Sequence, residues 1–357
     1  MTAAPLTIAV TGLNATDNPG PGVGVIRALR AHPDFQGRIV GLAYDSLDPG
    51  IYAHDLVDDV FLMPYPSQGL AAFSTRLAEV HGRVPFDVVI PTLDAEIPTF
   101  IDLEPQLRTL GIGSFLPSQE LFDLRSKAHL AHLGEIANIN TPATRVIADP
   151  NDLRQLEGKL EYPFWVKGAY YGATEVHDVH EAIAAYHQMV AKWGVPVIAQ
   201  AGVDGDEIDV VAVGDGEGGM VGAVPMRKRL LTDKGKGWAG IAIRDPEIEE
   251  LSRRYFAATK WRGPCEIEMM RSQSGELHLL EINPRFPAWC YLSAGAGMNL
   301  PWAVAQLAAG RDVAPMHEYE VGKMFVRISL DQIVSLSDFE SIAATGELHR
   351  CTPGDAS

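Results

Sequence analysis

The stretch from Cys265 to Trp289 constrains the fold more than any other part of the chain, because it predicts two strands joined by a tight turn. The turn falls on Ser272–Gly275, a cluster of residue types that favours a hairpin. The second strand carries an apolar run from Leu277 to Ile282. Pro284 ends the pairing because proline has no N–H to donate.

Polar side chains interrupt this apolar hairpin at regular spacing. Strand side chains repeat with period two, so Glu266 and Glu268 share one face, as do Glu281 and Asn283. If the strands pair, Glu268 approaches Glu281 and Asn283, with Arg285 just beyond. Carboxylates are costly to bury without partners, but they suit Mg²⁺, which takes oxygen ligands together with nucleotide phosphates, and arginine holds phosphate bidentately. Spacing alone equally permits an edge hairpin with one solvent-facing polar side.

The order Glu281-x-Asn283-Pro-Arg285 resembles the metal-binding strand of the ATP-grasp superfamily, particularly its carbamoyl-phosphate-synthetase-like and biotin-carboxylase-like branches. The resemblance implies ATP as cofactor with Mg²⁺, or alternatively Mn²⁺, held by Glu268, Glu281 and Asn283. It implies a catalytic role for Arg285. The expected fold is α/β (α+β): a Rossmann-like pre-ATP-grasp domain, a lid subdomain and a C-terminal core built on a mixed sheet.

Composition limits the partners. The 357 residues suffice for two or three domains. A net charge of −17 argues against a nucleic-acid partner. The three cysteines have no framework spacing, and no Cys/His set suggests zinc. With neither a signal-peptide pattern nor a membrane-length apolar run, we expect a cytoplasmic protein that acts on small molecules.

The first 116 residues predict a parallel α/β domain. Apolar runs at residues 6–11, 38–44 and 86–91 alternate with a glycine-rich turn and a helical pattern. An NAD-binding loop is one interpretation, but Val25 stands where the dinucleotide fingerprint requires glycine. Pro19 and Pro21 also remove N–H donors that a pyrophosphate would need. Thr92, Asp94 and Glu96 follow the third strand, where they predict either substrate contacts or a helix cap.

Residues 117–200 are assigned to the first part of the ATP-grasp domain, including its lid. A helix over 121–137 contains Lys127, and the resemblance implies that this lysine reaches the nucleotide phosphates. Lys167 ends an apolar strand that enters a loop containing glycine, which is a common way to place a positive charge on phosphate. Without the resemblance, Lys127 would be a solvated helix lysine and Lys167 an edge-strand lysine. Tyr170 and Tyr171 make this loop bulkier than is usual in the family, so it closes either on phosphate or on substrate.

Residues 201–335 are assigned to the core and 336–357 to a tail. By resemblance Gln200, Ala201 and Val203 form the adenine-binding hinge, and Glu207 accepts the ribose hydroxyls. Arg227 and Arg229 lie in a cluster of positive charge that indicates an anion in this acidic chain. By resemblance, Arg227 and Arg229 are expected to hold the carboxylate substrate and the developing acyl phosphate, and a solvated charged strand end is the alternative. The resemblance places Lys167, with its positive charge on phosphate, among the catalytic residues as well.

The implied activity is that of an ATP-dependent carboxylate–amine ligase, which forms a C–N bond and releases ADP and phosphate. Its substrates would be a small carboxylate and an amine, with an amino acid or peptide among the candidates, and a homodimer is common among similar proteins. Two alternatives stay open. One is a two-domain NAD-dependent oxidoreductase, and the other is a nucleotide-binding protein without ligase activity.

Overall fold

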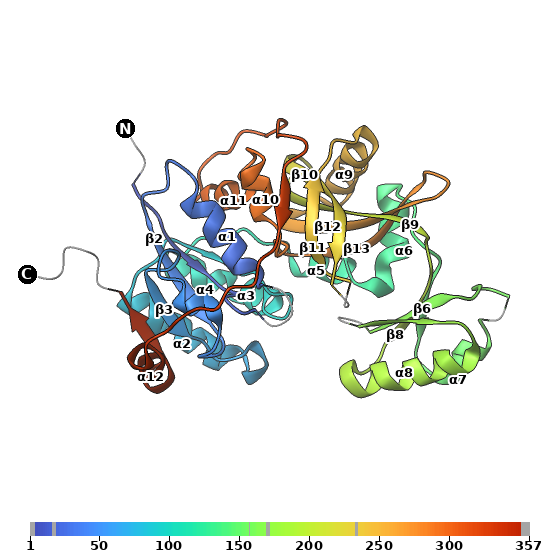
Figure 1. Ribbon diagram of the computed structural model, residues 1–357, viewed down its shortest axis with the longest axis horizontal. Coiled ribbons are helices and arrows are strands. Elements are labelled where there is room, and N and C mark those ends of the chain that lie inside the picture. Colours follow the sequence, from blue (N-terminus) through green and yellow to red (C-terminus); the bar gives the residue numbers. More distant parts are fainter. Residues whose placement is uncertain (1–3, 16–18, 157, 169–171, 233–234, 351–357) are drawn as a thin grey trace, which may run out of the picture.

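The computed structural model describes residues 4–15, 19–156, 158–168, 172–232 and 235–350. Three sheets follow one another across the molecule (Figure 1). The first domain and the core lie side by side, and the lid projects from the far side of the core.

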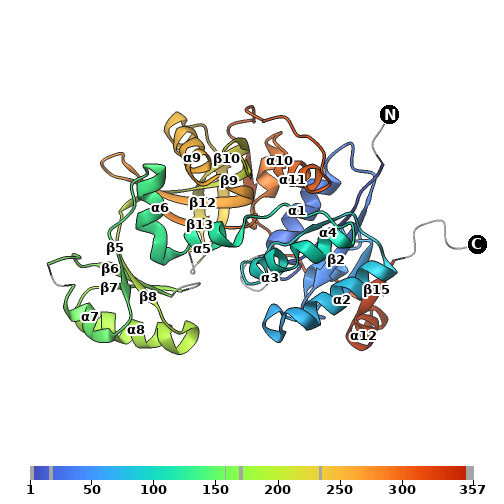
Figure 2. The ribbon, with the colours of Figure 1, turned by 180° about the vertical axis from the view of Figure 1, so that it is seen from behind.

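The first sheet is parallel apart from one edge strand. Its order is β15-β3-β2-β1-β4, and β1 to β4 are mutually parallel where they pair. The strands are β1 (Thr7–Val10), β2 (Arg38–Ala43), β3 (Asp59–Leu62) and β4 (Val88–Ile90). The helices are α1 (Pro21–Arg30), α2 (Leu70–Arg83), α3 (Ile97–Asp102) and α4 (Glu104–Thr109), with 3₁₀ turns η1 (Pro49–Tyr52) and η2 (Pro66–Gln68). Seen from behind, α2 and α4 cover the face of the sheet away from α1 (Figure 2).

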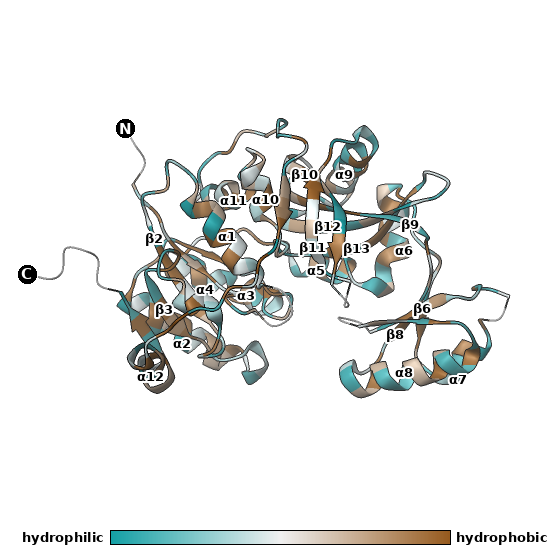
Figure 3. Ribbon diagram, viewed as in Figure 1, coloured by the Kyte–Doolittle hydropathy of each residue, from teal (hydrophilic) through white to brown (hydrophobic). Residues whose placement is uncertain are grey.

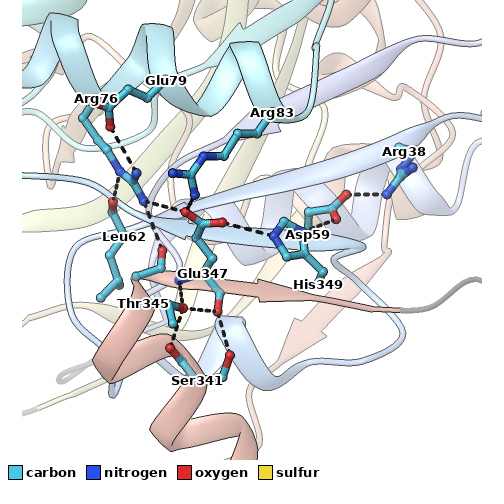
Figure 4. A network of polar contacts seen from close by, with 11 residues as sticks. Arg38, Asp59, Leu62, Arg76, Glu79, Arg83, Ser341, Thr345, Glu347 and His349 are labelled. Atoms are coloured by element: carbon cyan, nitrogen blue, oxygen red, sulfur yellow. Dashed lines mark hydrogen bonds and ion pairs between the residues drawn. The ribbon is translucent and has the colours of Figure 1, made fainter.

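The C-terminal residues complete this first sheet. Sequence analysis assigns 336–357 to a tail, whereas the described part forms α12 (Leu336–Thr345) and β15 (Glu347–His349). β15 pairs antiparallel with β3 and so adds an edge strand. Glu347 forms ion pairs with Arg76 and Arg83, and His349 contacts Asp59 (Figure 4). These residues are far from β3 in sequence, so local patterns do not reveal the pairing.

The link between the first domain and the lid is more broken than the sequence predicts. In place of one helix over 121–137, the chain forms α5 (Gln119–Leu124), the 3₁₀ turn η3 (Lys127–His129) and α6 (Leu130–Ala137). Ser126 is extended between them, with φ −59° and ψ 147°. The break turns Lys127 towards the core, where its side chain is buried.

The lid is a four-stranded antiparallel sheet in the order β5-β8-β6-β7, backed by two helices. The strands are β5 (Thr144–Ile147), β6 (Phe164–Gly168), β7 (Ala173–Val176) and β8 (Val197–Ala201), and the helices are α7 (Pro150–Arg154) and α8 (Val179–Trp193). Asp178 caps α8 by accepting from the N–H groups of His180 and Glu181. Tyr170 and Tyr171 lie outside the described residues.

The core sheet has the order β13-β12-β9-β10-β11-β14, and all five of its pairings are antiparallel. The expectation of a mixed sheet is therefore corrected. Three of the pairings (β9 with β10, β10 with β11, and β12 with β13) join consecutive strands as hairpins, which pair antiparallel. The strands are β9 (Gly205–Asp215), β10 (Met220–Leu231), β11 (Gly237–Ala242), β12 (Arg262–Ser272), β13 (Leu277–Asn283) and β14 (Met324–Val326); the helices are α9 (Pro246–Thr259), α10 (Tyr291–Gly295) and α11 (Leu300–Ala308).

The two faces of the core sheet are buried in different ways. One face packs with α6 and α9 through residues such as Ile208, Tyr255 and Ile267. The other contributes Val211 and Val224 to an apolar cluster that also contains side chains of α1 and α11. The first domain and the core sheet therefore share one hydrophobic cluster. This shared cluster fixes the first domain beside the part of the sheet face that carries polar side chains.

Candidate functional site

The expected hairpin forms and has the expected register. β12 and β13 pair with Glu266 opposite Asn283 and Glu268 opposite Glu281. Gly275, at φ +93°, makes the turn in a conformation that L side chains rarely adopt. Because opposed residues in antiparallel strands share a face, the polar residues of this hairpin lie on one face of the sheet.

The hairpin side chains form a hydrogen-bonded row. Asn283 Nδ2 donates to Glu266 Oε2 at 3.1 Å and to Glu268 Oε1 at 2.7 Å. Trp289 Nε1 donates to the other oxygen of Glu266 at 2.8 Å. Asn283 therefore presents its amide nitrogen to the carboxylates, and it would have to turn its amide over to place Oδ1 on a cation at this position.

Lys127 reaches this row from η3. Its Nζ lies 2.8 Å from Glu281 Oε1, and only 9% of the residue is exposed. The structure thus brings the predicted phosphate-binding lysine and a predicted metal ligand into direct contact.

Two residues that sequence analysis does not single out extend the row onto β9 and β10. Lys228 Nζ contacts Glu207 and lies 3.0 Å from Asp209 Oδ2. Asp209 of β9 is opposite Glu268 of the neighbouring strand β12. Oxygens of Glu207, Asp209 and Glu268 lie within 4.8 Å of one another. Asp209 shares a strand face with Glu207 by the period of two, so this spacing could have revealed it.

Lys167 faces the row from the lid. Its Nζ donates to Gln200 Oε1 at 2.6 Å, while Gln200 Nε2 donates to the Thr144 hydroxyl at 3.2 Å. Gln200 is buried, at 2% exposure, and therefore orients Lys167. Burial lowers the pKa of Lys167, Lys127 lowers it further, and Glu281 opposes both effects.

Arg285 links the hairpin to the first domain. Its Nε donates to Asp94 Oδ2 at 2.8 Å and its Nη1 to Glu266 Oε2 at 3.0 Å. Burial alone would raise the pKa of Asp94, but Arg285 and Arg125 hold it below its ordinary value. Thr92 and Glu96, from the same loop, bond to Thr11 and Tyr44 within the first domain instead.

The two predicted arginines of β10 lie apart from this charged row. Met226 is opposite Asp209 and Arg227 is opposite Ile208, so Arg227 lies on the other face of the sheet from Lys228. Arg227 approaches Asp206, at 3.9 Å, and Arg229 is exposed. The sequence shows a run of positive charges, but the register of β10 decides which charge faces the site.

Arg327 is a further cation on the same side as the row. Phe325 of β14 is opposite Gly240 of β11, and Gly240 is opposite Lys228 of β10, so these three residues share one face of the sheet. Arg327 lies two residues after Phe325 and therefore lies on this face too. Its Nη1 is buried without a hydrogen-bond partner among the described residues. Burial lowers the pKa of Arg327 to about 10, while the nearby Glu266 raises it.

The expected hinge joins lid and core, because β8 ends at Ala201 and β9 begins at Gly205. Ala201 N–H donates to the Ala143 carbonyl at 2.9 Å and is therefore not available to an adenine. Val203 lies between the two strands and is partly buried. Glu207, expected at the ribose, is engaged by Lys228.

Together these side chains form what we call the charged cluster, on one face of the core sheet with Lys167 added from the lid. Its members are Lys127, Lys167, Glu207, Asp209, Lys228, Glu266, Glu268, Glu281, Asn283 and Arg285. Burial raises the pKa of Asp209, Glu266 and Glu281, and the nearby Glu268 raises the pKa of each further. Asp209 Oδ1 is buried with no hydrogen-bond partner among the described residues. The oxygen donors and the crowding of negative charge fit a divalent cation of the Mg²⁺ type.

The glycine-rich turn of the first domain has a different role. Gly20 N–H donates to the Asn14 carbonyl, and Gly22 N–H donates to the Gly12 carbonyl. A side chain at Gly22 would meet the Thr11 carbonyl oxygen at 1.8 Å. These N–H groups bond within the turn and so are not directed at a pyrophosphate.

Comparison with known proteins accounts for this arrangement. Residues 195–328 match the family model described as "ATP-grasp in the biosynthetic pathway with Ter operon". Solved ATP-grasp structures superpose on most of the chain. The chain has the ATP-grasp fold. The resemblance expected from Glu281-x-Asn283-Pro-Arg285 is thereby confirmed.

The individual proteins to which this chain is similar are distant in sequence. The carbamoyl phosphate synthase large chain of Thermoanaerobacter sp. (strain X514) is 23% identical over 227 residues, covering 60% of this chain and 21% of that protein. The L-amino acid ligase from Bacillus licheniformis has a TM-score of 0.66 at 17% identity, covering 86% of this chain and 75% of that one. The biotin carboxylase domain dimer of the Hydrogenobacter thermophilus 2-oxoglutarate carboxylase, in complex with MgADP and bicarbonate, has a TM-score of 0.70 at 14% identity, covering 90% and 74%.

Proposed function

We propose that this chain is an ATP-dependent ligase that activates a carboxylate as an acyl phosphate and transfers the acyl group to an amine. The observation that carries the proposal is the charged cluster: it gathers lysines, an arginine and carboxylates on one sheet face beside a hinged lid. The two similar solved proteins named above, a ligase and a carboxylase domain bound to MgADP, support the same class of chemistry.

The reaction requires charge to be neutralised at two points. A substrate carboxylate oxygen attacks the terminal phosphorus of ATP, the bond to the bridging oxygen breaks, and ADP leaves. The amine nitrogen then attacks the acyl carbon, loses a proton, and displaces phosphate. Both steps bring negative oxygens together, so positioning and electrostatic stabilisation supply most of the catalysis.

The chain's own residues divide this task by location. Lys127 and Lys167 would contact the terminal phosphates from the core and from the lid. Glu268, Glu281 and Asn283, with Asp209 beside them, would hold Mg²⁺ or alternatively Mn²⁺, which neutralises phosphate charge when bound. Arg285 and Lys228, each held by two carboxylates, would be placed where the acyl phosphate develops.

The lid supplies the means to exclude water from an acyl phosphate. It connects to the core through the short segment between Ala201 and Gly205, and its Lys167 faces the charged cluster. We assign adenine to this hinge, with Val203 as the backbone contact, and the ribose to Glu207. Closure over the nucleotide would complete the site.

A screen for ADP release tests the proposal. Amino acids and small carboxylates are supplied in pairs with Mg-ATP, and products are read by mass spectrometry. ADP release that depends on an added carboxylate, with an amide product, supports a ligase. ATP binding without such release would support the alternative of a nucleotide-binding protein.

Glu281→Ala should remove turnover while leaving the fold intact, because it deletes both a proposed metal ligand and the partner of Lys127. Glu276→Ala is a matched control, since Glu276 is exposed on the same hairpin. Normal ADP release by Glu281→Ala would contradict the metal assignment.

A further inference from the structure

Arg327 is a cation on the face of the charged cluster that has no counterion of its own. The residue is partly buried, and its Nη1 is buried without a hydrogen-bond partner among the described residues. Burying a guanidinium without a partner costs free energy. The position of Arg327 on the same face as Lys228 therefore indicates an anion that comes from outside the chain.

Arg285 shows the paired arrangement on the same face. Burial alone would lower the pKa of Arg285, but its two carboxylate partners, Asp94 and Glu266, raise it. The pKa of Arg327 is instead lowered to about 10, because burial outweighs the attraction of Glu266. Both oxygens of Glu266 already accept from other side chains, Arg285 among them. Glu266 is thus near Arg327 but is engaged elsewhere.

The backbone and an aromatic ring hold Arg327 in place. Its N–H donates to the Trp238 carbonyl at 3.0 Å, which extends the pairing of β14 with β11 by one residue. Its guanidinium carbon lies 5.5 Å from the centre of the Phe325 ring, a distance at which cations and aromatic rings attract. The surrounding strand is mostly hydrophobic (Figure 3), with Val326 and Ile328 on either side of Arg327. The charge is therefore held on a paired strand among apolar neighbours.

The place of Arg327 in the sheet separates it from the residues assigned to the nucleotide. The strand order puts β13, which carries Glu281, at one edge and β14 at the other. The β13 edge lies towards the lid and the β14 edge towards the first domain (Figure 1). Lys127 and Lys167 lie on the lid side, near Glu281. An anion at Arg327 would therefore lie on the side of the site away from the ATP phosphates.

We propose that Arg327 binds a carboxylate of the amine substrate, so that this amine carries its own carboxylate, as an amino acid does. The inference rests on the proposed ligase function. The carboxylate that is activated meets the ATP phosphates and stays on the lid side. The amine nitrogen attacks the acyl carbon from the side that the nucleotide leaves open. A guanidinium on that side can hold a carboxylate through two parallel hydrogen bonds, which selects such amines and orients the nitrogen.

Steady-state kinetics test this role. The carboxylate that supports ADP release is held at saturation while an amino acid is varied as the amine. In Arg327→Gln the KM for the amino acid should rise by roughly 10- to 100-fold, the range for loss of a hydrogen bond to a charged group. The KM for the activated carboxylate should not change. Arg327→Lys should recover part of the affinity because it keeps the charge, and Arg244→Gln, at an exposed arginine of the core, is the matched control.

Hydroxylamine separates this role from a structural one. It carries no carboxylate, and its nitrogen attacks the acyl carbon, loses a proton and displaces phosphate to give a hydroxamate. Arg327→Gln should therefore form hydroxamate at the rate of the unaltered protein. A hydroxamate rate that falls together with the amino acid reaction, or a raised KM for the activated carboxylate, would contradict the proposal.

Binding without turnover distinguishes failure of this inference from failure of the ligase proposal. The full chain with Mg²⁺ and a non-hydrolysable ATP analogue is titrated by calorimetry with each common amino acid and with its amide, in which a neutral carboxamide replaces the carboxylate. At least one amino acid should bind roughly tenfold or more tightly than its amide, and Arg327→Gln should lose this preference. That result without any ADP release would retain the carboxylate site and reject the ligase. Binding of no amino acid, or a preference that persists in Arg327→Gln, would overturn the inference whether or not ADP is released.

Discussion

At the scale of single residues, the contact between Lys167 and Gln200 bears on the phosphate contact proposed for the lid. Gln200→Leu removes the acceptor at 2.6 Å from Lys167 Nζ and leaves the ammonium without its fixed direction. Hydrogen bonds to charged groups contribute about 1.5–3 kcal/mol, so Mg-ATP affinity should fall by roughly tenfold. Titration calorimetry measures the Mg-ATP affinity, and Gln155→Leu, at an exposed position of the same subdomain, is the control. Equal affinities in the two variants would remove Gln200 from the site.

The same lysine predicts a pH dependence. Burial lowers the pKa of Lys167, so it loses its proton at a lower pH than an ordinary lysine, whose pKa is 10.5. The protonated ammonium attracts phosphate and the neutral amine does not. Mg-ATP affinity should therefore fall as pH rises from neutral into the alkaline range. Lys167→Arg should flatten this dependence, because arginine stays charged; an identical slope in that variant would assign the titration to another group.

Single residues also show how far sequence alone could lead. The pairing of Glu268 with Glu281 follows from the period of a strand and a short turn, both of which are local. Sequence alone does not reveal that Lys228, and not Arg227, faces the charged cluster, because this depends on the register between β9 and β10. Gln200 was predicted at the hinge on a resemblance, but its bond to Lys167 depends on the pairing of β6 with β8.

At the scale of elements, α12 and β15 test whether the C-terminal residues are part of the first domain. Ile342 of α12 is fully buried in the shared hydrophobic core. Ile342→Ala should destabilise the protein by about 2–5 kcal/mol, through lost burial and the cavity left behind. Denaturant unfolding measures the change, and the exposed Ser337→Ala on the same helix should have little effect. A cost below about 1 kcal/mol would mean that α12 contributes little to the fold.

The elements themselves were predictable where their signals are local. Three apolar runs of the first domain became β1, β2 and β4, and the hairpin became β12 and β13. The single helix expected over 121–137 divides into three pieces, and the break at Ser126 brings Lys127 into contact with Glu281, a residue distant in sequence that local patterns do not reveal. β15 could not be predicted, because its three residues form a strand only against β3.

At the scale of the whole molecule, the first domain is tied to the charged cluster through β12 and β13. Arg262, at the start of β12, donates to the Ser114 and Leu116 carbonyls, and Arg285, just after β13, donates to Asp94. The orientation of Arg285 therefore depends on the first domain as well as on the core. A residue of the first domain thus helps to set the position of a proposed catalytic side chain beside the core.

This coupling predicts the effect of Asp94→Asn. The substitution removes the charge that holds Arg285 Nε, while Glu266 keeps its contact with Nη1 at 3.0 Å. A charged hydrogen bond contributes about 1.5–3 kcal/mol, so carboxylate-dependent ADP release should fall by roughly 10- to 100-fold. Mg-ATP affinity should change much less, because Asp94 contacts Arg285, which is proposed to hold the acyl phosphate, and neither of the lysines proposed for the nucleotide phosphates. Single-turnover kinetics and calorimetry separate the two quantities, with the exposed Asp102→Asn as control. Equal losses in affinity and turnover would place Arg285 on the nucleotide itself, and no loss in either would remove the first domain from catalysis.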